Sequence, residues 1–335
     1  MRVLHLVDCA GNPATASAAG VLACRAAIQG LASHDHTVLL VADTAGEAMA
    51  RELGLRTHDR VTPVLRRPPL AWKSIAAFSV RRGPFDVVQC WSTAVQRAAS
   101  RVFPDAVVRP PPRALPVPRS VSNRTRDQMR HALGLRPDDI ALLLLPDPRW
   151  RGNAQRFAFF IGLLEFAGEH PVGVLPACVD HVQRASTFHA RVLLNARLVP
   201  STLPAPILAA ACDVGVLQVP AVLERPDTDL ELAWRRAFVR AARRTGLPVL
   251  APSGFGVDDL CEYSAGARSL ALTSATDRPA DLAKICLPLL HDPGLLRSLS
   301  VPGSAADTAA HEDAAALAAL DESWHRAAQP AETVP

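Results

Sequence analysis

The sequence predicts an α/β protein made of two doubly wound halves, each built on a parallel sheet. Short apolar runs alternate with helical stretches almost throughout the chain, which is the pattern of strand–helix–strand units. Five prolines between positions 107 and 118 interrupt this alternation, and it restarts after them. At 335 residues, the chain also exceeds what one hydrophobic core usually holds. We therefore expect two domains that face each other across a ligand-binding cleft.

The first half follows the apolar pattern element by element. Strands are expected at 3–7, 37–42, 60–65 and 86–90, and helices at 16–32, 46–53, 71–80 and 94–101. The run 107–118 is expected to be an extended linker, because its prolines fit neither a helix interior nor a central strand. An N-terminal domain over residues 1–118, ending in this linker, follows from that assignment.

The second half repeats the alternation. Strands are expected at 141–145, 171–175, 213–217 and 248–251, with a weaker one at 192–194, and helices at 123–133, 154–168, 177–184, 206–211, 230–244 and 307–328. Gly246 suits the left-handed cap of the 230–244 helix. We expect a C-terminal domain at 119–304. Residues 305–335 should form a helix that returns toward the N-terminal domain, followed by a frayed tail.

Composition excludes several classes of protein. The net charge of +4 is too small to imply a nucleic-acid partner. No apolar run reaches transmembrane length, and no signal segment precedes the first expected strand, so a cytoplasmic location is expected. The seven cysteines are scattered, without a Cys-x-x-Cys pair, and predict reduced thiols rather than a zinc site.

The segment from Arg244 to Asp259 is the most informative part of the chain. An arginine-rich helix ends at Gly246, and the short apolar run 248–251 reads as a buried parallel strand. Gly254 and Gly256 then allow the backbone to approach a ligand closely where the next helix is expected to begin.

This segment resembles the sugar-nucleotide region of GT-B glycosyltransferases of family four (glycosyl transferases group 1). Further matches follow in the family's order, at residues 31–38, 85–89, 130–145, 197–200, 208–214 and 291–297. The resemblance implies two Rossmann-like domains. It also implies a retaining glycosyltransferase that uses a nucleotide-sugar donor and an unknown acceptor, with no metal or other cofactor.

The resemblance also implies where the donor would bind. Arg149, Arg151 and Gly152 stand where the family holds the diphosphate, and two guanidinium groups beside a helix N-terminus suit that anion. Arg197 and Val199 belong to a base pocket at 197–200. Further donor contacts are expected from the turn after the 248–251 strand and from an N-terminal loop: Ser253, Gly254, Gly256 and Gly11.

The catalytic acidic residues depart from the family pattern. Ala233 and Ala241 occupy the positions of two family glutamates, and Asp259 stands at the later acidic position, which makes it the candidate catalytic residue. Glu224 and Glu231 lie nearby, but a shifted residue points elsewhere on a helix. Two functions therefore stay open: a glycosyltransferase, and a non-catalytic GT-B-like protein that binds a nucleotide or a partner without transferring sugar.

Two further patterns lie in the first half. The interval from Arg60 to Arg82 carries six basic residues and no acidic one, interleaved with apolar residues. It predicts peripheral contact with an anionic membrane or a lipid-linked acceptor, and a solvated face over an apolar core explains it equally well. His34 and His36 are expected to have a structural role, with side chains on opposite sides of the chain.

Overall fold

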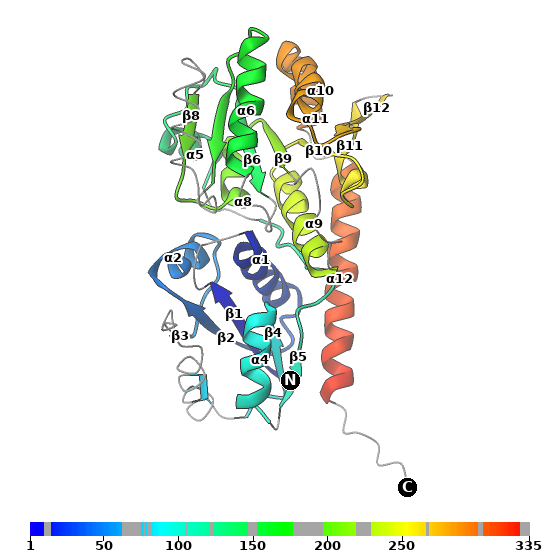
Figure 1. The fold of residues 1–335 in the computed structure, drawn as a ribbon. Coiled ribbons are helices and arrows are strands. Elements are labelled where there is room, and N and C mark those ends of the chain that lie inside the picture. The colour runs from blue at the N-terminus through cyan, green and yellow to red at the C-terminus, as the bar shows by residue number, and fades with distance from the viewer. Residues whose placement is uncertain are drawn as a thin grey trace. The chain divides into compact units, whose positions relative to one another are not determined.

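The computed structural model describes residues 1–9, 15–61, 75–76, 78, 82, 84–104, 106–120, 124–146, 153–176, 197–218, 229–265, 268–300 and 304–328. The chain divides into two compact units (Figure 1). Unit 1 contains Met1–Pro118 and His311–Pro335, and unit 2 contains Arg119–Ala310. The predicted α/β class with two parallel sheets is confirmed.

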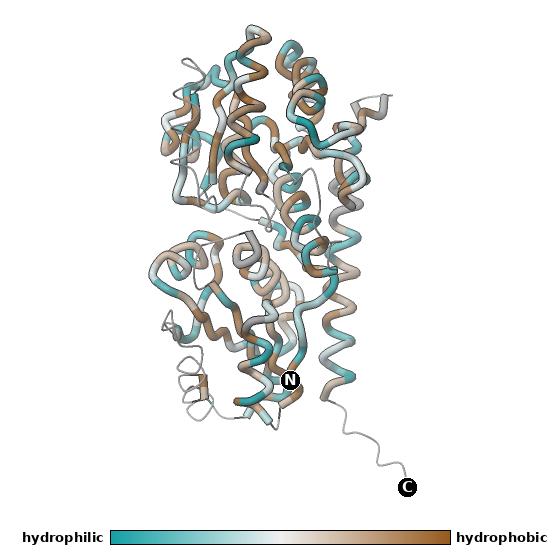
Figure 2. The backbone as a smooth tube through the Cα atoms, in the orientation of Figure 1, coloured by the Kyte–Doolittle hydropathy of each residue, from teal (hydrophilic) through white to brown (hydrophobic). Residues whose placement is uncertain are grey.

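Unit 1 is built on a five-stranded parallel sheet in the order β3-β2-β1-β4-β5. Its strands are β1 (Arg2–Cys9), β2 (Asp35–Ala42), β3 (Asp59–Val61), β4 (Val87–Cys90) and β5 (Val107–Arg109). The helices between them are α1 (Thr15–Gly30), α2 (Thr44–Glu52) and α4 (Thr93–Val102). Figure 2 shows the apolar residues concentrated along the central strands, as expected for strands covered on both faces.

The expected linker is only partly a linker. Its first three residues form β5, which pairs in parallel with β4 at the edge of the sheet. Pro110 and the prolines that follow then end the strand, because proline has no N–H to donate to a ladder. The prolines alone predicted a linker over the whole stretch, whereas the β-branched pair Val107 and Val108 favours a strand at its start.

The C-terminal helix α12 (Ser304–Ala328) packs on unit 1 through its second half. Trp324 is fully buried and donates its indole N–H to Gln89 Oε1 at 3.0 Å. Asp313 is also buried, and its carboxylate accepts from the backbone N–H of Val117 at 2.9 Å. Contacts of this kind join the end of the chain to strand β4 and to the proline-rich segment.

A chain of hydrogen bonds crosses the interior of unit 1. The indole N–H of Trp91 can only donate, so Nδ1 of His5 accepts its bond at 3.2 Å. Nε2 of His5 therefore carries a proton and donates to His36 Nδ1 at 2.9 Å, and His36 Nε2 donates in turn to the carbonyl of Leu31 at 2.8 Å. This direction fixes both imidazoles as neutral tautomers. Burial accordingly lowers the pKa of His5 well below its ordinary value of 6.5, and burial also lowers the pKa of His36.

Unit 2 has a six-stranded parallel sheet in the order β13-β10-β9-β6-β7-β8. Its strands are β6 (Ala141–Pro146), β7 (Val172–Leu175), β8 (Arg197–Pro200), β9 (Val214–Gln218), β10 (Val249–Pro252) and β13 (Thr273–Ser274). The helices are α5 (Arg126–Ala132), α6 (Asn153–Phe166), α8 (Ala205–Leu208), α9 (Asp229–Arg244), α10 (Pro279–His291) and α11 (Pro293–Leu299), with a 3₁₀ turn at Ala209–Ala211. Residues of α6 and α10 share one core cluster with β6, β9 and β10.

The glycine that ends α9 behaves as expected, and the element after β10 does not. Gly246 has φ +81°, the left-handed conformation of a helix C-cap. The acidic helix expected after Gly256 is instead a 3₁₀ turn at Asp258–Cys261. It leads into an antiparallel hairpin of β11 (Glu262–Ala265) and β12 (Arg268–Ala271). A one-turn 3₁₀ segment provides little of the dipole that a full helix start would offer an anion, so that part of the expectation is wrong.

No helix within the described residues is both long and apolar enough to cross a membrane.

Candidate functional site

The carboxyl ends of four neighbouring strands in unit 2 meet at one edge of the sheet. Pro146 pairs with Gln218, and Pro252 pairs with Ser274. Leu250 pairs with Val216, so continuing that register by two residues brings Pro252 level with Gln218. In doubly wound sheets, ligands bind outside the carboxyl ends of the strands. This edge is therefore the candidate site.

Among the described residues at this edge, Gln218 is the buried one whose side-chain polar atoms have no hydrogen-bond partner. The residue is 1% exposed, and within the described part of the chain neither its amide nitrogen nor its amide oxygen has a hydrogen-bond partner. Leaving a buried amide without partners costs free energy, about 1–3 kcal/mol in proteins. A group in this condition at a strand end is suited to bind a ligand.

The neighbours of Gln218 show which face of the sheet it belongs to. Alternate residues of a strand point the same way, so Gln218 shares the face of Val214 and Val216. Those two valines belong to the core cluster that contains Phe157 and Phe160 of α6. Helix α6 begins at Asn153, seven residues after β6 ends at Pro146. Gln218 thus lies on the α6 face of the sheet, at the edge that carries the βα connection leading into α6.

Next along the edge, the turn after β10 has two glycines with positive φ and free space beside one of them. Gly254 and Gly256 have φ +83° and +72°, where residues with a Cβ are strained. A Cβ on Gly254 would meet no atom within 4 Å, so the space beside this residue is open. Asp258 holds the turn from inside: its carboxylate accepts from the backbone N–H of Gly254 at 3.1 Å and from Ser253 Oγ at 2.7 Å.

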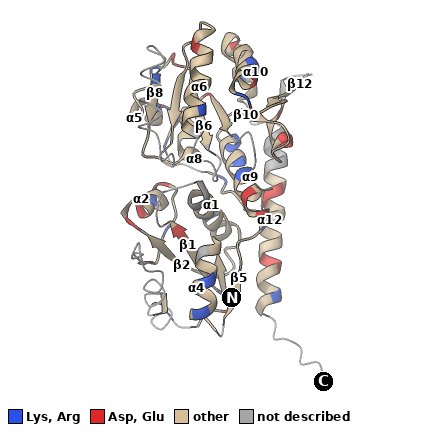
Figure 3. Ribbon diagram, in the orientation of Figure 1, with Lys and Arg blue, Asp and Glu red and all other residues tan. Residues whose placement is uncertain are grey.

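Arginines of α9 donate hydrogen bonds to the backbone carbonyls of this turn. Arg235, 2% exposed, donates to the carbonyl of Phe255 at 2.8 Å, and Arg236 donates to the carbonyl of Gly256 at 2.6 Å. Arg243 donates to the carbonyls of Leu260 and Glu262 further along. Figure 3 shows the basic positions along α9. The arginine-rich helix is therefore a clamp for the glycine turn and the 3₁₀ segment.

Asp259, the candidate catalytic residue, belongs to the same clamp. Its two carboxylate oxygens accept from the two terminal nitrogens of Arg236 at 2.8 and 2.7 Å. This paired hydrogen bond is the main reason that the pKa of Asp259 is lowered. The carboxylate is ionised at neutral pH and does not serve as a proton donor, although its side chain is still 52% exposed. It can accept a hydroxyl hydrogen bond or face a positive charge.

The positions of the two missing glutamates lie on the inner side of α9. Ala233 is 4% exposed and Ala241 is fully buried. Glu231 is 6% exposed on the same helix, and Glu224 lies outside the described residues. The positions of the two family glutamates are therefore filled by small apolar side chains that cannot contact a ribose through a carboxylate.

Several predicted site residues lie outside the part of the chain that the structure describes. These are the diphosphate residues Arg149, Arg151 and Gly152, the loop residue Gly11, and most of the basic interval from Arg60 to Arg82. Their roles stay predictions.

Arg197 and Val199 occur at a different place in unit 2. Both belong to β8, which lies four strands from β10, about 19 Å at the usual strand spacing. Arg197 begins the strand and donates to Asp139 Oδ2 at 2.8 Å and to the carbonyl of Gly134. The structure thus separates these two residues from the glycine turn, and their predicted role in a base pocket remains untested.

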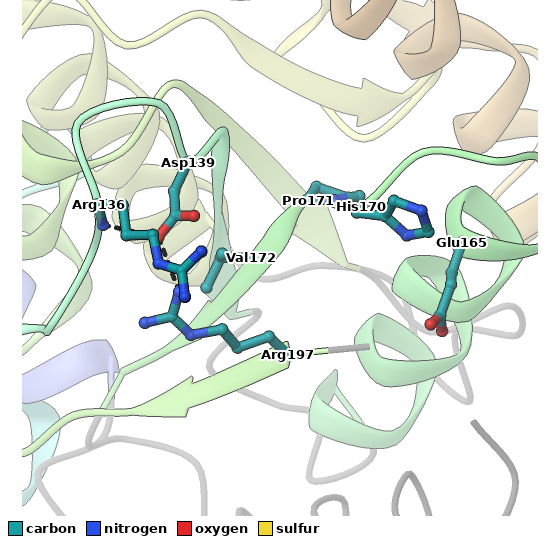
Figure 4. A pocket seen from close by; sticks show the side chains of 7 residues that line it. All are labelled: Arg136, Asp139, Glu165, His170, Pro171, Val172 and Arg197. Atoms are coloured by element: carbon teal, nitrogen blue, oxygen red, sulfur yellow. Dashed lines mark hydrogen bonds and ion pairs between the residues drawn. The ribbon is translucent and has the colours of Figure 1, made fainter. Parts of the chain in front are cut away.

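Arg197 lines a hollow of about 220 Å³ at the amino ends of β7 and β8 (Figure 4). Arg136, Asp139 and Arg197 lie together on one side, and Glu165 and His170 on the other. Both carboxylate oxygens of Glu165 are enclosed, and neither has a hydrogen-bond partner in the described part of the chain. The hollow is at the edge opposite to the strand ends where ligands bind in this type of sheet.

Gln218 was not among the site residues predicted from the sequence. The signal was a polar residue directly after four residues of apolar strand, Val214 to Leu217. A polar strand end is common at the surface, and only the burial of Gln218 makes it informative.

The chain is similar to known proteins in structure, but it matches no known family in sequence. No protein-family model matches the chain, and no curated protein sequence matches it. Among solved structures, Anabaena HepE in complex with UDP and glucose is 13% identical, with 97% of this chain and 100% of that chain covered, at a TM-score of 0.56. A Listeria monocytogenes protein, provisionally named UDP-N-acetylglucosamine 2-epimerase, is 12% identical over 100% and 99% of the two chains, at 0.55. A Rickettsia africae glycosyltransferase is 11% identical over 98% and 99%, at 0.52.

The fold is GT-B. Similarity at this level of identity shows the architecture over the whole chain: two doubly wound units, each with its own parallel sheet. Proteins of this fold include glycosyltransferases and epimerases, so the architecture does not decide between them.

Proposed function

We propose that this protein binds a nucleotide-sugar at the carboxyl edge of the unit 2 sheet and transfers the sugar to an acceptor, as a retaining glycosyltransferase of the family-four type. The observation that carries the proposal is the buried, unpartnered amide of Gln218, on the α6 face of that edge. Its amide can donate to a phosphate or accept from a hydroxyl, so it fits the polar groups of a nucleotide-sugar.

Two further features support the same ligand. The glycine turn at 253–256 leaves open space beside Gly254 and is fixed by the arginines of α9, so it is already organised before a ligand arrives. The α6 N-terminus follows Arg149 and Arg151, whose cationic side chains would stabilise a diphosphate there. Anabaena HepE, which has a similar fold, was solved with UDP and glucose.

In the proposed reaction, the bond between the sugar and the diphosphate breaks, a glycosidic bond to the acceptor oxygen forms, and the departing diphosphate takes up the proton of the acceptor hydroxyl. Negative charge develops on the departing diphosphate, and the predicted arginines would stabilise that charge without a resident metal. Asp259 is proposed to act as an ionised carboxylate that faces either the transferred sugar or the ribose of the nucleotide. The acceptor, a membrane contact through the basic interval 60–82 and a cytoplasmic location belong to the same proposal.

The binding step is tested by calorimetry with a panel of UDP-, ADP- and GDP-sugars. We expect one site per chain, and at least about tenfold weaker binding in Gly254→Ala, because the strained turn shifts. Gly134→Ala is the matched control: its φ is +63°, and a Cβ there also meets nothing within 4 Å, but it lies at the turn between α5 and β6. Equal loss of affinity in both variants would show that the effect is not local to the site.

A second function has specific support. The carboxylate of Asp259 is already bound by Arg236, and the inner positions of α9 hold Ala233 and Ala241. A protein that binds nucleotide-sugars without transferring sugar would have these features. Donor hydrolysis and transfer assays distinguish the two functions: we expect slow turnover that Asp259→Ala removes. Binding with no turnover in the unsubstituted protein would favour the non-catalytic function.

A further inference from the structure

The end of α12 and the turn before β2 bring three metal-ligating side chains together in unit 1. His34 Nε2 lies 2.7 Å from Asp321 Oδ1, and His325 Nδ1 lies 3.3 Å from the same oxygen. All three ligand atoms lie within 4.8 Å of one another. The expectation that the side chains of His34 and His36 lie on opposite sides of the chain is wrong, because the two rings contact each other at 6.1 Å between centroids.

We propose that His34, Asp321 and His325 form a zinc-binding site that fastens the last turns of α12 to the sheet of unit 1. The site is independent of the proposed sugar chemistry, because all three residues belong to unit 1. The binding of Zn²⁺ there would be structural in effect.

The spacing of the ligand atoms suits a tetrahedral ion. Zinc binds imidazole nitrogen and carboxylate oxygen at about 2.0–2.2 Å, which separates neighbouring ligand atoms by about 3.3 Å. The separation between His325 and Asp321 is already 3.3 Å. The one between His34 and Asp321 is 2.7 Å and needs to open by about 0.6 Å, and the two histidine nitrogens, which lie within 4.8 Å of each other, need to reach the same separation. Asp321 and His325 are four residues apart on α12, so they share one face of the helix.

The chemistry of the set favours zinc over harder cations. Two imidazoles and one carboxylate match the preference of Zn²⁺ and its first-row neighbours, whereas Mg²⁺ and Ca²⁺ require mostly oxygen ligands. His34 is enclosed, with 6% of its side chain exposed, and its ring contacts the Trp324 ring at 5.6 Å between centroids. Asp321 and His325 are 37% and 58% exposed, so an ion can enter and a water can complete the coordination.

Besides these small movements, binding requires a change of tautomer in both histidines. Nδ1 of His325 faces the carbonyl of Asp321 at 3.0 Å, and Nε2 of His34 faces a carboxylate oxygen. When these nitrogens bind Zn²⁺, each neutral ring carries its proton on the other nitrogen. The carboxylate exchanges its hydrogen bonds for a bond to the metal.

The test uses the full chain without a polyhistidine tag, titrated with ZnCl₂ by calorimetry, with Co²⁺ absorption as a probe of tetrahedral geometry. Cys178 lies outside the described residues, so a Cys178→Ser background removes it as a competing ligand. The other six cysteines are buried. Burial raises the thiol pKa of Cys90 and Cys286 to about 12, which keeps such thiols protonated and unavailable to the metal.

We expect one Zn²⁺ per chain and a metal-induced rise in the melting temperature. Replacing the exposed ligand, in His325→Ala, should weaken zinc binding by at least about 100-fold and remove that rise, since even indirect partners of a metal site contribute 10- to 100-fold. His311→Ala is the matched control, because His311 is exposed on the same helix and lies outside the cluster. Equal zinc affinity in the two variants, or no saturable zinc binding by the unsubstituted protein, would overturn the proposal.

Discussion

Two glutamines, one in each unit, are equally buried but differ in their side-chain hydrogen bonds. Gln89 in β4 and Gln218 in β9 are each 1% exposed. The Gln89 amide donates to the carbonyls of Cys90 and Pro110, each at 2.9 Å, and accepts from the Trp324 indole at 3.0 Å. The Gln218 amide has no hydrogen-bond partner among the residues that the structure describes.

This difference separates a polar group that holds the fold from one that is available to a ligand. Gln89 joins β4, the proline-rich segment and α12, so its hydrogen bonds replace those that it would make with water. Burial removes the hydrogen bonds that the Gln218 amide would make with water, and no described residue replaces them. Burial alone therefore does not distinguish a structural polar residue from a ligand-binding one, whereas its hydrogen-bond partners do.

The largest effect is expected from removing the partner of Gln89. Trp324→Ala should lower the free energy of unfolding by about 3–5 kcal/mol, because it empties a fully buried site and leaves the Gln89 oxygen without its donor. Urea denaturation followed by circular dichroism measures this loss. Phe166→Ala is the control, with a side chain that is 93% exposed, and it should change little. A loss below about 1 kcal/mol for Trp324→Ala would show that α12 does not pack on unit 1 in solution.

The next largest effect is on the free energy of unfolding when either glutamine is replaced by leucine, and the two replacements should act in opposite directions. Gln89→Leu should destabilise the protein by about 1–3 kcal/mol, because it leaves the Trp324 indole and a backbone carbonyl unpaired. Gln218→Leu should leave the stability unchanged or raise it by about 1 kcal/mol, since it removes a buried amide that has no partner.

The same pair separates stability from ligand binding. Gln218→Leu should weaken nucleotide-sugar binding by about tenfold, as one or two hydrogen bonds are lost, whereas Gln89→Leu should leave the affinity of the folded protein unchanged. Calorimetry on both variants provides the comparison. If Gln218→Leu destabilised the protein as strongly as Gln89→Leu, Gln218 would have a structural partner and the proposed site would lose its main support.

The smallest effect concerns pH and again depends on unit 1. Burial is the largest cause that holds the pKa of His5 well below 6.5, and the nearby His36 and His58 lower it further. The unfolded chain therefore binds a proton at His5 more readily than the folded one. Stability should therefore be fully present above about pH 6.5 and fall as the pH decreases below that value. Urea midpoints at pH 8 and pH 5.5 measure the fall, and His5→Gln should reduce it. A fall of the same size in His5→Gln would assign the effect to other groups.

Much of the architecture could be predicted from the sequence, because it depends on local periodicity. The apolar run 141–145 became β6, and the alternation before and after the proline-rich segment became two separate parallel sheets. Gly246 was predicted correctly since a left-handed cap depends on one residue and its immediate neighbours. The hairpin of β11 and β12 was missed, because its short strands have no long apolar pattern.

The site could be predicted only in part. The glycine turn after β10 was expected from its spacing, and its conformation agrees with positive φ at Gly254 and Gly256. Its surroundings were not predictable: Arg236 lies 23 positions before Asp259, and only the packing of α9 beside the turn joins the two side chains. The contact between His34 and Asp321 spans 287 positions, far beyond any local pattern.

By itself, the sequence determined the order and kind of most elements, the break between two halves, and the glycines that require unusual backbone angles. These properties follow from side-chain periodicity and from steric limits on single residues. Only the tertiary structure decided which polar groups found partners when water was excluded. It gave Gln89 three hydrogen bonds and Gln218 none, because the elements around each residue come from distant parts of the chain.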